Sequence, residues 1–493
     1  MILLVLLVLL LPLLISYYFK KKKRYEELWK YLDVIPEPKS YPILGTNYKI
    51  HTRESLFVRE RLRAIDLFPI YKLWSFDIAA VIVMHPEDVE LVVNNSKHND
   101  KSLIYSFLHD WLGTGLLTSG GTKWNKRRKI LTPAFHFNIL QEFVGMLNKE
   151  TQILVDNLMK LSDAPHIDVT KSITEFTLYS IGETSLGVSL REDPNCKRYK
   201  QAVYDFGEYF AYRLVRPWLY IPLIYRLSSV YKKTKNTINI LHDFSTNVIN
   251  ERKKTFVPND NLSYSDRKRL ALLDLMLRAK HDGADIDDEG IREELDTFIF
   301  EGHDTTACSI GFTLMALANE PKIQEEIYQE LLTVVGESQE PSYQELGDLK
   351  YLERCIKESL RLYPSVPLIA RIAGENIQTK TGYTIPKGCN VNIDIYDMHR
   401  RPEFWENPEK FDPDRFLLEN SIKRHPFVYI PFSAGSRNCI GQRFALLEIK
   451  AVLCGILRKF KLEPVTRPED VVYAADLVLR SSGEIKVKFV PRV

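Results

Sequence analysis

The sequence predicts a mostly α (α+β) fold, in which a single large helical domain with small β-sheets follows an N-terminal transmembrane helix. Helical runs with short Pro or Gly breaks fill most of the 493 residues, strand-like runs are few and short, and the first nineteen residues are almost all apolar. Hydrophobic residues make up 45% and charged residues 27%, which is ordinary for a folded globular protein. No second domain boundary interrupts the helical runs, so we expect one continuous core.

The segment Met1–Phe19 is the candidate membrane span. Only Pro12 and Ser16 interrupt its apolar run, and the basic block Lys20–Arg24 follows it. Nineteen helical residues reach roughly 28 Å, close to the ~30 Å hydrocarbon thickness of a bilayer. Positive charge after the span predicts a signal-anchor, with the rest of the chain in the cytosol. The predicted organisation is an anchor over residues 1–19, a basic and proline-rich linker over 20–42 and the globular domain over 43–493.

Within the globular domain, proline and glycine positions delimit the expected elements. A proline is tolerated in the first turn of a helix and disfavours helix in the residue before it. The longest helix is therefore expected to end before Pro321. The expected elements are a hairpin of Ile70–Trp74 and Ala79–Val83, a helix from Pro86, helices Asp288–Asn319 and Leu349–Leu362, and strand-like runs at Tyr383–Ile395 and Glu484–Val490.

Charge and cysteine content exclude several function classes. Lys plus Arg is 67 and Asp plus Glu is 64, so the net charge of +3 gives no reason to expect nucleic acid as a partner. The six cysteines form no CxxC pair and no zinc-like spacing, so a disulfide framework is not expected. A lone cysteine in such a chain is usually a small buried apolar residue.

Cys439 differs from the other five cysteines in its surroundings. The segment from Phe432 to Gly441 reads FSAGSRNCIG, with a glycine four residues before the cysteine and another two after it. Such a loop can approach a flat ligand closely, and backbone N–H groups with a helix starting near Gly441 favour a thiolate. Arg437 can pair with a carboxylate of the same ligand. The pattern predicts that Cys439 is a metal ligand, against the alternative of a buried cysteine in a tight turn.

This segment resembles the haem-binding loop of cytochromes P-450, and the similarity extends over roughly residues 40 to 493. Glu358 and Arg361 resemble the family's Glu-x-x-Arg helix, and Phe411–Phe416 resembles the loop whose arginine, here Arg415, joins that ion pair. Taken alone, a Glu–Arg pair at i, i+3 is more often a weak surface contact. The resemblance implies a buried structural cluster, the helical cytochrome P-450 fold, and haem b with Cys439 as the iron ligand.

The expected long helix carries a polar stripe. Glu301, Asp304 and Thr305 interrupt an apolar run, which is costly in a buried helix unless the side chains serve a purpose; the alternative is a solvated face. Glycine at position 302, which costs about 1 kcal/mol relative to alanine in a helix interior, predicts room for a small ligand such as O₂ beside the helix. In the family this stretch crosses the haem, and the resemblance implies that Asp304 and Thr305 are catalytic residues that deliver protons.

Glu301 narrows the resemblance to family 4, the fatty-acid ω-hydroxylases. Their FEGHDTT motif, present at Phe300–Thr306, implies an ester between Glu301 and a haem methyl group. Trp124 and Arg128 resemble the family's haem-propionate partners, and Arg371 is similar in context; the alternative for the first two is a surface cation–π contact. With Arg437 and Cys439, these residues make up the implied cofactor site.

The resemblance implies a monooxygenase that activates O₂ and hydroxylates long-chain lipids, meaning fatty acids or related terpenoids and xenobiotics, at or near the terminal carbon. The alternatives are a haem-thiolate isomerase or dehydratase that needs no reductase, and a non-catalytic haem-binding protein. No flavin or nicotinamide motif is present, so the implied electron donors are NADPH-cytochrome P-450 reductase and cytochrome b5 in the endoplasmic reticulum membrane. Basic residues could form the docking face for these donors: Lys123, Lys126, Arg127, Lys129, Arg443 and Lys450.

Overall fold

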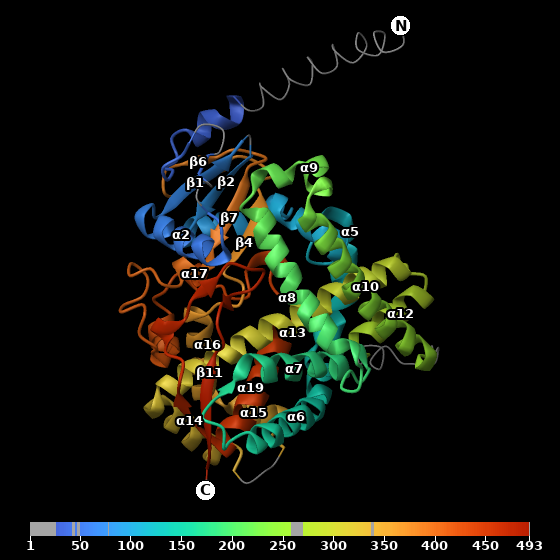
Figure 1. Cartoon of the computed structure of the whole chain (residues 1–493). Helices are drawn as coiled ribbons and strands as arrows, with labels where there is room; N and C mark the ends of the chain where they lie inside the picture. The colour runs from blue at the N-terminus through green and yellow to red at the C-terminus, as the bar shows by residue number, and fades with distance from the viewer. Residues whose placement is uncertain are drawn as a thin grey trace.

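A computed structural model describes residues 26–41, 45–46, 50–76, 78–257, 270–336 and 340–492. Helices form the larger part of the molecule, and a four-stranded sheet lies at the end where the described chain begins (Figure 1). Among the described residues, no helix is both long and apolar enough to cross a membrane. The predicted span over residues 1–19 and the basic block Lys20–Arg24 of the predicted linker lie outside the described residues.

The four-stranded sheet has the order β1-β2-β7-β4. The predicted hairpin is present: β1 (Ile70–Ser75) pairs antiparallel with β2 (Ile78–Val83). β7 (Asn390–Asp394) runs parallel to β2, and β4 (Leu368–Ile372) runs antiparallel to β7. This pairing brings the strand-like run after Tyr383 beside a hairpin some three hundred residues earlier in the chain.

The predicted long helix is α13, Asp288–Asn319. It begins where the Asp287 side chain accepts a hydrogen bond from Gly290 N, and it ends before Pro321. Most of its residues are buried, which excludes a solvated polar face. α13 packs against α7 (Val169–Ile181), α10 (Ser229–Thr255) and α19 (Gln442–Lys459), and so crosses the centre of the molecule (Figure 1).

The remaining elements surround this centre. A three-stranded sheet of order β3-β11-β8 and two short hairpins complete the β structure. The strands of this sheet are β3 (Ile167–Asp168), β8 (Phe460–Pro464) and β11 (Lys486–Pro491). The two hairpins are β5–β6 (Ile377–Gln378, Thr384–Ile385) and β9–β10 (Tyr473–Ala474, Arg480–Ser481). The main further helices are α2 (Arg53–Asp66), α3 (Pro86–Val93), α5 (Gly121–Leu131), α6 (Phe137–Lys160), α8 (Asn195–Leu214), α9 (Pro222–Leu227), α12 (Leu272–His281), α14 (Pro321–Val334), α15 (Tyr343–Asp348), α16 (Lys350–Leu362) and α17 (Ile395–Met398).

Glu358 and Arg361 on α16 form a fully buried ion pair. Arg361 donates from Nε and Nη2 to the two Glu358 oxygens at 2.7 and 2.8 Å. Arg415 Nε lies 3.3 Å from Glu358 Oε1, and Asp412 N donates to the same oxygen at 2.8 Å. The surface-pair alternative is therefore wrong, and the cluster implied by the resemblance is present.

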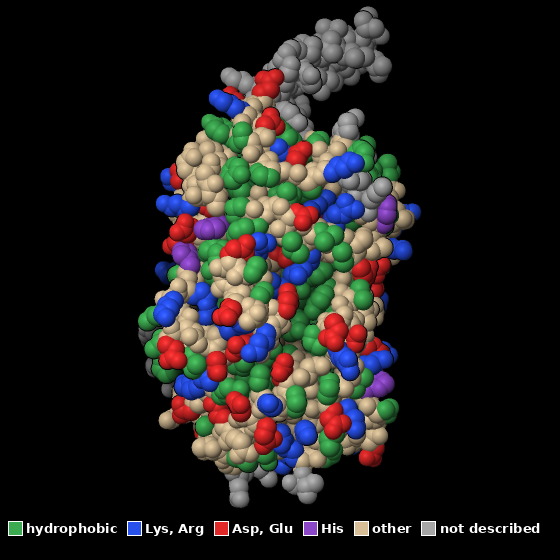
Figure 2. Space-filling view, turned by 90° about the vertical axis from the view of Figure 1, so that its left-hand side faces the viewer, with side chains coloured by type: hydrophobic (Ala, Val, Ile, Leu, Met, Phe, Trp, Pro, Cys, Tyr) green, Lys and Arg blue, Asp and Glu red, His purple; other side chains and the backbone are tan. Residues whose placement is uncertain are grey.

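On the surface, acidic and basic side chains are interspersed over the face in Figure 2. All six cysteines are free.

Candidate active site

A cavity of about 490 Å³ lies between the four-stranded sheet and α13. Its wall is mainly apolar, with side chains such as Leu108, Leu117, Ile181, Phe300, Leu368 and Val478. Cys439 borders this cavity, and its side chain is exposed although it lies deep in the protein. The volume falls within the ~300–1,000 Å³ of small-molecule sites, and an apolar wall with a few polar groups is typical of them.

The loop before α19 presents Cys439 to the cavity. Cys439 N donates to Phe432 O at 2.9 Å, which closes the loop. Gly435 has φ +70°, and a Cβ there would lie 2.0 Å from Val93 O, so this glycine serves contact with the end of α3 and not with a flat ligand. Gly441 caps α19, and a Cβ there would lie 3.9 Å from Cys439 Sγ. The space beside the sulfur therefore stays open.

The protein environment alone does not produce a thiolate at Cys439. Burial and the nearby Glu301 carboxylate raise the pKa of this thiol to about 12, whereas the Gly441 N–H and Arg128 act to lower it. The Gly441 N–H thus favours the thiolate, as predicted, but the desolvation cost is larger. A thiolate here needs a cation at the sulfur itself.

Four basic side chains gather on the cavity wall: Lys101, Arg128, Arg371 and Arg437. Arg371 and Arg437 are buried and the other two are half-buried, and none of the four has an ion pair with a carboxylate of the described residues, which is unusual for cations in such a place. Burial lowers the pKa of each, and the two neighbouring arginines lower that of Lys101 further. The cluster is thus a preformed site for an anion.

Hydrogen bonds to carbonyl groups hold these cations in place. Arg128 donates to Asn438 O and Oδ1, both at 2.9 Å, which ties α5 to the Cys439 loop. Arg437 donates to Asn99 O at 3.1 Å, Leu116 O at 3.2 Å and Ser119 O. Its guanidinium carbon lies 4.3 Å from the ring centre of buried Trp124. The alternative of a surface cation–π contact is therefore wrong for Trp124.

The donor set fits haem b. The Cys439 thiol, which would need a cation at the sulfur to ionise, faces the open cavity. The cations on the same cavity wall have no carboxylate partner among the described residues, and they could pair with the two carboxylates of a haem. Cys439 would ligate the iron, and the predicted residues Trp124, Arg128, Arg371 and Arg437 all border the cavity where the carboxylates would lie.

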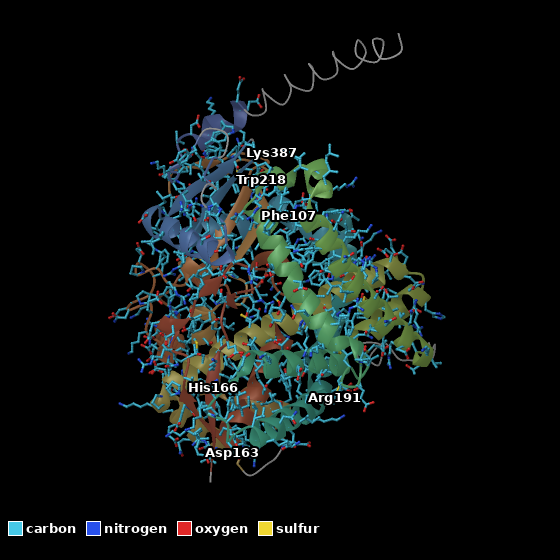
Figure 3. The ribbon with its side chains drawn as sticks, viewed as in Figure 1. Phe107, Asp163, His166, Arg191, Trp218 and Lys387 are labelled. Carbon is cyan, nitrogen blue, oxygen red and sulfur yellow. The ribbon has the colours of Figure 1, made fainter. Side chains whose placement is uncertain are left out.

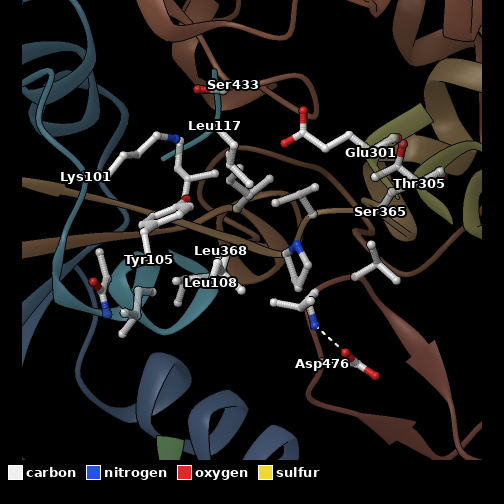
Figure 4. A pocket seen from close by; sticks show the side chains of 18 of the residues that line it. Lys101, Tyr105, Leu108, Leu117, Glu301, Thr305, Ser365, Leu368, Ser433 and Asp476 are labelled. Carbon is white, nitrogen blue, oxygen red and sulfur yellow. Dashed lines mark hydrogen bonds between the residues drawn. The ribbon is translucent and has the colours of Figure 1, made fainter. Parts of the chain in front are cut away.

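Glu301 and Thr305 enter the cavity from α13. The Glu301 carboxyl and the Lys101 amine extend toward the middle of the cavity from different walls (Figure 4). Burial raises the pKa of Glu301 to about 7, against the opposing effects of Lys101 and Arg128. Thr305 Oγ1 donates to Glu301 O at 2.6 Å, and Thr305 O accepts from Ser365 Oγ at 2.8 Å.

Asp304 lies apart from these residues. Its carboxylate is 1% exposed, does not border the cavity, and pairs with Arg480 Nη2 at 2.6 Å. Of the two predicted catalytic residues, the structure therefore brings Thr305 to the cavity. Asp304 stays outside the cavity wall, paired with Arg480.

Gly302 does not leave room for a small ligand in the direction of its missing side chain. A Cβ there would lie 2.7 Å from Ile181 Cδ1 and 3.1 Å from Ile181 Cγ1. In that direction the glycine permits α7 to pack closely on α13, but Gly302 also borders the cavity, so room for O₂ beside the helix stays a prediction.

Two buried acids of α13 position the loop that leads to α5. Glu293 Oε1 accepts from Thr114 N at 2.8 Å, and Glu294 Oε2 accepts from Leu116 N at 2.9 Å. A Cβ at Gly113 would lie 2.4 Å from Glu293 Oε1, so the glycine allows this contact. The loop therefore follows α13 and delivers Trp124 and Arg128 to the cavity.

The sequence prediction missed Lys101, Tyr105 and Glu448. Lys101 Nζ lies 4.4 Å from the Tyr105 ring centre, and nothing in their local sequence distinguishes them from surface residues. Glu448 was detectable, because it is a lone acid in the apolar part of α19. It is fully buried beside Thr306 and Ser180, and burial raises its pKa to about 8.

Comparison with known proteins agrees with this geometry. The family model for cytochrome P-450 matches residues 35–489. Cytochrome P-450 4c3 of Drosophila melanogaster is 41% identical over 95% of this chain and 91% of its own. Cytochrome P-450 4V2 is 39% identical in both Mus musculus and Homo sapiens, over 94% of this chain and 91% of theirs. The chain therefore belongs to the cytochrome P-450 family, within its family 4, and is a haem-thiolate monooxygenase.

Proposed function

We propose that this monooxygenase hydroxylates long-chain lipids, meaning fatty acids or related terpenoids and xenobiotics, at or near the terminal carbon. The proposal rests on the observation that Glu301 and Cys439 both line the same mainly apolar cavity. The apolar wall suits an alkyl chain, because burial of apolar surface contributes about 25 cal/mol per Å². Terminal C–H bonds are harder to break than their neighbours, so a rigid, narrow site must enforce attack at that end.

Haem b would be held by Cys439 at the iron and by Arg128, Arg371, Arg437 and Trp124 around its carboxylates. When bound with a thiolate ligand, it supplies the chemistry that cleaves O₂ for insertion of one oxygen atom into a C–H bond. Thr305 Oγ1 is at the cavity and can pass a proton by exchanging its bond to Glu301 O for one with a ligand. Asp304 is the proton source behind it.

Glu301 would fix the cofactor through an ester with a haem methyl group. The Glu301 carboxyl already faces the cavity among the unpaired cations, so no rearrangement of α13 is needed. The ester joins a carboxyl oxygen to the methyl carbon and removes two hydrogens, and the enzyme's own turnover with O₂ supplies the oxidant. A fixed macrocycle would not tilt, which would preserve the alignment of a terminal carbon.

Product mapping tests this function. The reductase-supplied holoenzyme is incubated with saturated fatty acids of increasing length, and the hydroxylated carbon is located by mass spectrometry. We expect terminal alcohols to dominate, and the terminal fraction to fall in Glu301→Ala while total turnover persists. Mainly internal alcohols from the wild-type enzyme would refute terminal selectivity, and no fatty-acid product would refute fatty acids as substrates.

The alternative without a reductase is weaker. An isomerase or dehydratase has no need of a proton-donating acid next to Thr305 in the chain, whereas this chain has Asp304 at that position, buried and paired with Arg480. NADPH-dependent product formation only in the presence of reductase separates the two.

Electron donors would approach at the surface near Cys439. Of the predicted basic face, Arg127 and Lys450 are buried, and Lys123 and Lys126 pair with Glu293 and Asp285. Those four residues are unsuited to docking an acidic partner. Lys129 and Arg443 remain exposed and are the proposed contacts for NADPH-cytochrome P-450 reductase and cytochrome b5.

Exposed apolar side chains support association with the endoplasmic reticulum membrane. On α9, Leu223 is 68% and Leu227 is 80% exposed, and Trp218 beside it is 44% exposed. Trp218 and Phe107 lie at the end of the molecule where the described chain begins (Figures 1 and 3). Clustered exposed apolar side chains mark interaction sites. The described chain begins at that same end, so a membrane anchor that precedes it would hold α9 near the bilayer surface.

A further inference from the structure

Strand β7 carries a polar stripe on the face that borders the cavity. Its sequence, NVNID, alternates polar and apolar residues, and the apolar Val391 and Ile393 are fully buried in the core of the sheet. Successive side chains of a strand point to opposite faces. Asn390, Asn392 and Asp394 therefore share the other face, and all three border the cavity. The stripe places polar groups on a wall that is otherwise mainly apolar.

Asn392 is the member of the stripe whose hydrogen-bonding groups are unused. The Asn390 amide is occupied, because its Nδ2 donates to Ala79 O at 3.0 Å and its Oδ1 accepts from Leu103 N at 3.1 Å. The half-buried Asn392 side chain makes no hydrogen bond with any other residue that the structure describes. A side-chain amide has donors and an acceptor. The Asn392 amide is therefore available to a molecule in the cavity.

Asp394 lies beside it as an uncharged acid. Its side chain begins α17 by accepting from Asp397 N at 3.0 Å, and it has no ion pair with a cation of the described residues. Asp394 is 6% exposed. Burial and the neighbouring Asp397 carboxylate raise the pKa of Asp394 well above its usual value. Asp394 thus keeps its proton, so this part of the wall can donate and accept without carrying a charge.

The charged groups around this stripe are already paired. Each of three further acids on the cavity wall faces an arginine: Glu60 with Arg63, Asp397 with Arg61 at 2.9 Å, and Asp476 with Arg53 at 3.1 Å. Outside the four-cation cluster, Arg61 is the one basic side chain of the described residues that borders the cavity, and Asp397 occupies it. A buried charge without a partner is costly. A substrate carboxylate would find no free cation here.

We propose that Asn392 and Asp394 form a head-group subsite that takes the hydroxyl group of a long-chain alcohol and disfavours a free carboxylate. A hydroxyl group both donates and accepts, so it can donate to Asn392 Oδ1 and accept from Asn392 Nδ2 or the Asp394 carboxyl. The four unpaired cations near Cys439 match the haem carboxylates and are not available to the substrate. The inference rests on the proposed hydroxylation of a terminal carbon and selects lipid alcohols, terpenoid alcohols included, within that substrate class.

Spectral titration of the full-length holoenzyme tests this inference, because substrate that reaches the haem shifts the Soret band. Three ligands share one chain length and differ in the head: dodecan-1-ol, methyl dodecanoate and dodecanoate. We expect dodecan-1-ol to bind about tenfold more tightly than dodecanoate, which must bury an unpaired charge. Methyl dodecanoate should lie between them, because an ester accepts a hydrogen bond but does not donate one.

Variants of the stripe assign the preference. Asn392→Leu should weaken dodecan-1-ol by roughly 2- to 10-fold, the effect of an uncharged hydrogen bond, and leave dodecanoate within about twofold. Asp394→Asn keeps an uncharged polar group and should keep the preference. Ile82→Leu is the matched control: Ile82 lies opposite Asn392 on β2 and borders the cavity, so this change should affect all three ligands equally. If Asn392→Leu does not incorporate haem, Asn392→Val carries the same comparison.

The oxidation product shows which end of the alcohol is held. With NADPH and reductase, dodecan-1-ol should give dodecane-1,12-diol, because the stripe holds the hydroxyl group away from the haem. Dodecanal as the main product would place the hydroxyl group at the haem and overturn the inference.

Two binding results would also overturn the inference and leave the hydroxylase function intact. The first is a wild-type enzyme that binds dodecanoate as tightly as dodecan-1-ol. The second is an equal loss for all three ligands in Asn392→Leu, which would mean that Asn392 only shapes the cavity. If none of the three ligands shifts the spectrum or is oxidised, the proposed function and the inference fall together.

Discussion

Replacing Glu358 with alanine should destabilise the folded enzyme strongly. Glu358 and Arg361 are both 0% exposed, and Glu358 accepts from Arg361 twice, from Arg415 and from Asp412 N. Glu358→Ala leaves a buried guanidinium without its carboxylate and a backbone N–H without its acceptor. Removing one partner of a buried ion pair costs about 3–5 kcal/mol, or roughly 10²–10⁴-fold in the unfolding equilibrium.

The loss of the Glu358 carboxylate should also disturb the loop that carries Cys439. Arg361 Nη1 donates to His399 O at 2.9 Å, and His399 Nε2 accepts from Ile430 N at 3.0 Å, two residues before Phe432. We therefore expect less protein with the red-shifted Soret band that ferrous–CO haem shows with a thiolate ligand.

Urea unfolding followed by tryptophan fluorescence measures the effect, with Asp414→Ala as the matched control. Asp414 pairs with Arg354 at 3.5 Å on the surface, and its side chain is 63% exposed, so this loss should cost at most about 1 kcal/mol. Glu358→Gln keeps the shape and should fall between the two. If Glu358→Ala is as stable as Asp414→Ala, the argument from the buried ion pair is refuted.

Three further predictions follow from single contacts. Gly302→Ala should cost about 1–3 kcal/mol, because its Cβ would lie 2.7 Å from Ile181 Cδ1; Ile181→Val should recover part of this loss in urea unfolding, and no recovery would contradict the contact. Glu448 has a pKa of about 8 in the folded state, so it keeps its proton where the unfolded chain loses it. Stability should fall as pH rises from about 4.5 to 8, by up to about 1.4 kcal/mol per pH unit, and Glu448→Gln should remove this slope. Lys129→Glu with Arg443→Glu should slow reductase-supported turnover but leave peroxide-supported turnover unchanged; equal loss in both assays would place docking elsewhere.

The sequence predicted those features whose signals are local. The bounds of α13 follow from the Asp287 cap and Pro321, and the β1–β2 hairpin follows from two short apolar runs around a turn. The loop of Cys439 was recognisable because its glycines and Arg437 lie within seven residues of one another.

Features that depend on distant partners could not be predicted. Asp304 meets Arg480 across 176 positions, so nothing local indicated that this carboxylate would turn away from the cavity. Nothing in the sequence around Gly302 indicates that the Ile181 side chain packs against this glycine, where its missing side chain suggested space for a ligand. Lys101 joins the cation cluster only because the loop before α4 (His109–Leu112) folds back over the cavity.

We propose that Cys439 and Glu301 hold one haem from the same cavity, the first at the iron and the second by an ester. Intact-protein mass spectrometry after turnover and acid–ketone extraction is the decisive test. We expect a mass equal to protein plus haem less two hydrogens for the wild-type enzyme, and haem-free protein for Glu301→Ala. Complete extraction of haem from wild-type enzyme that has turned over would contradict it.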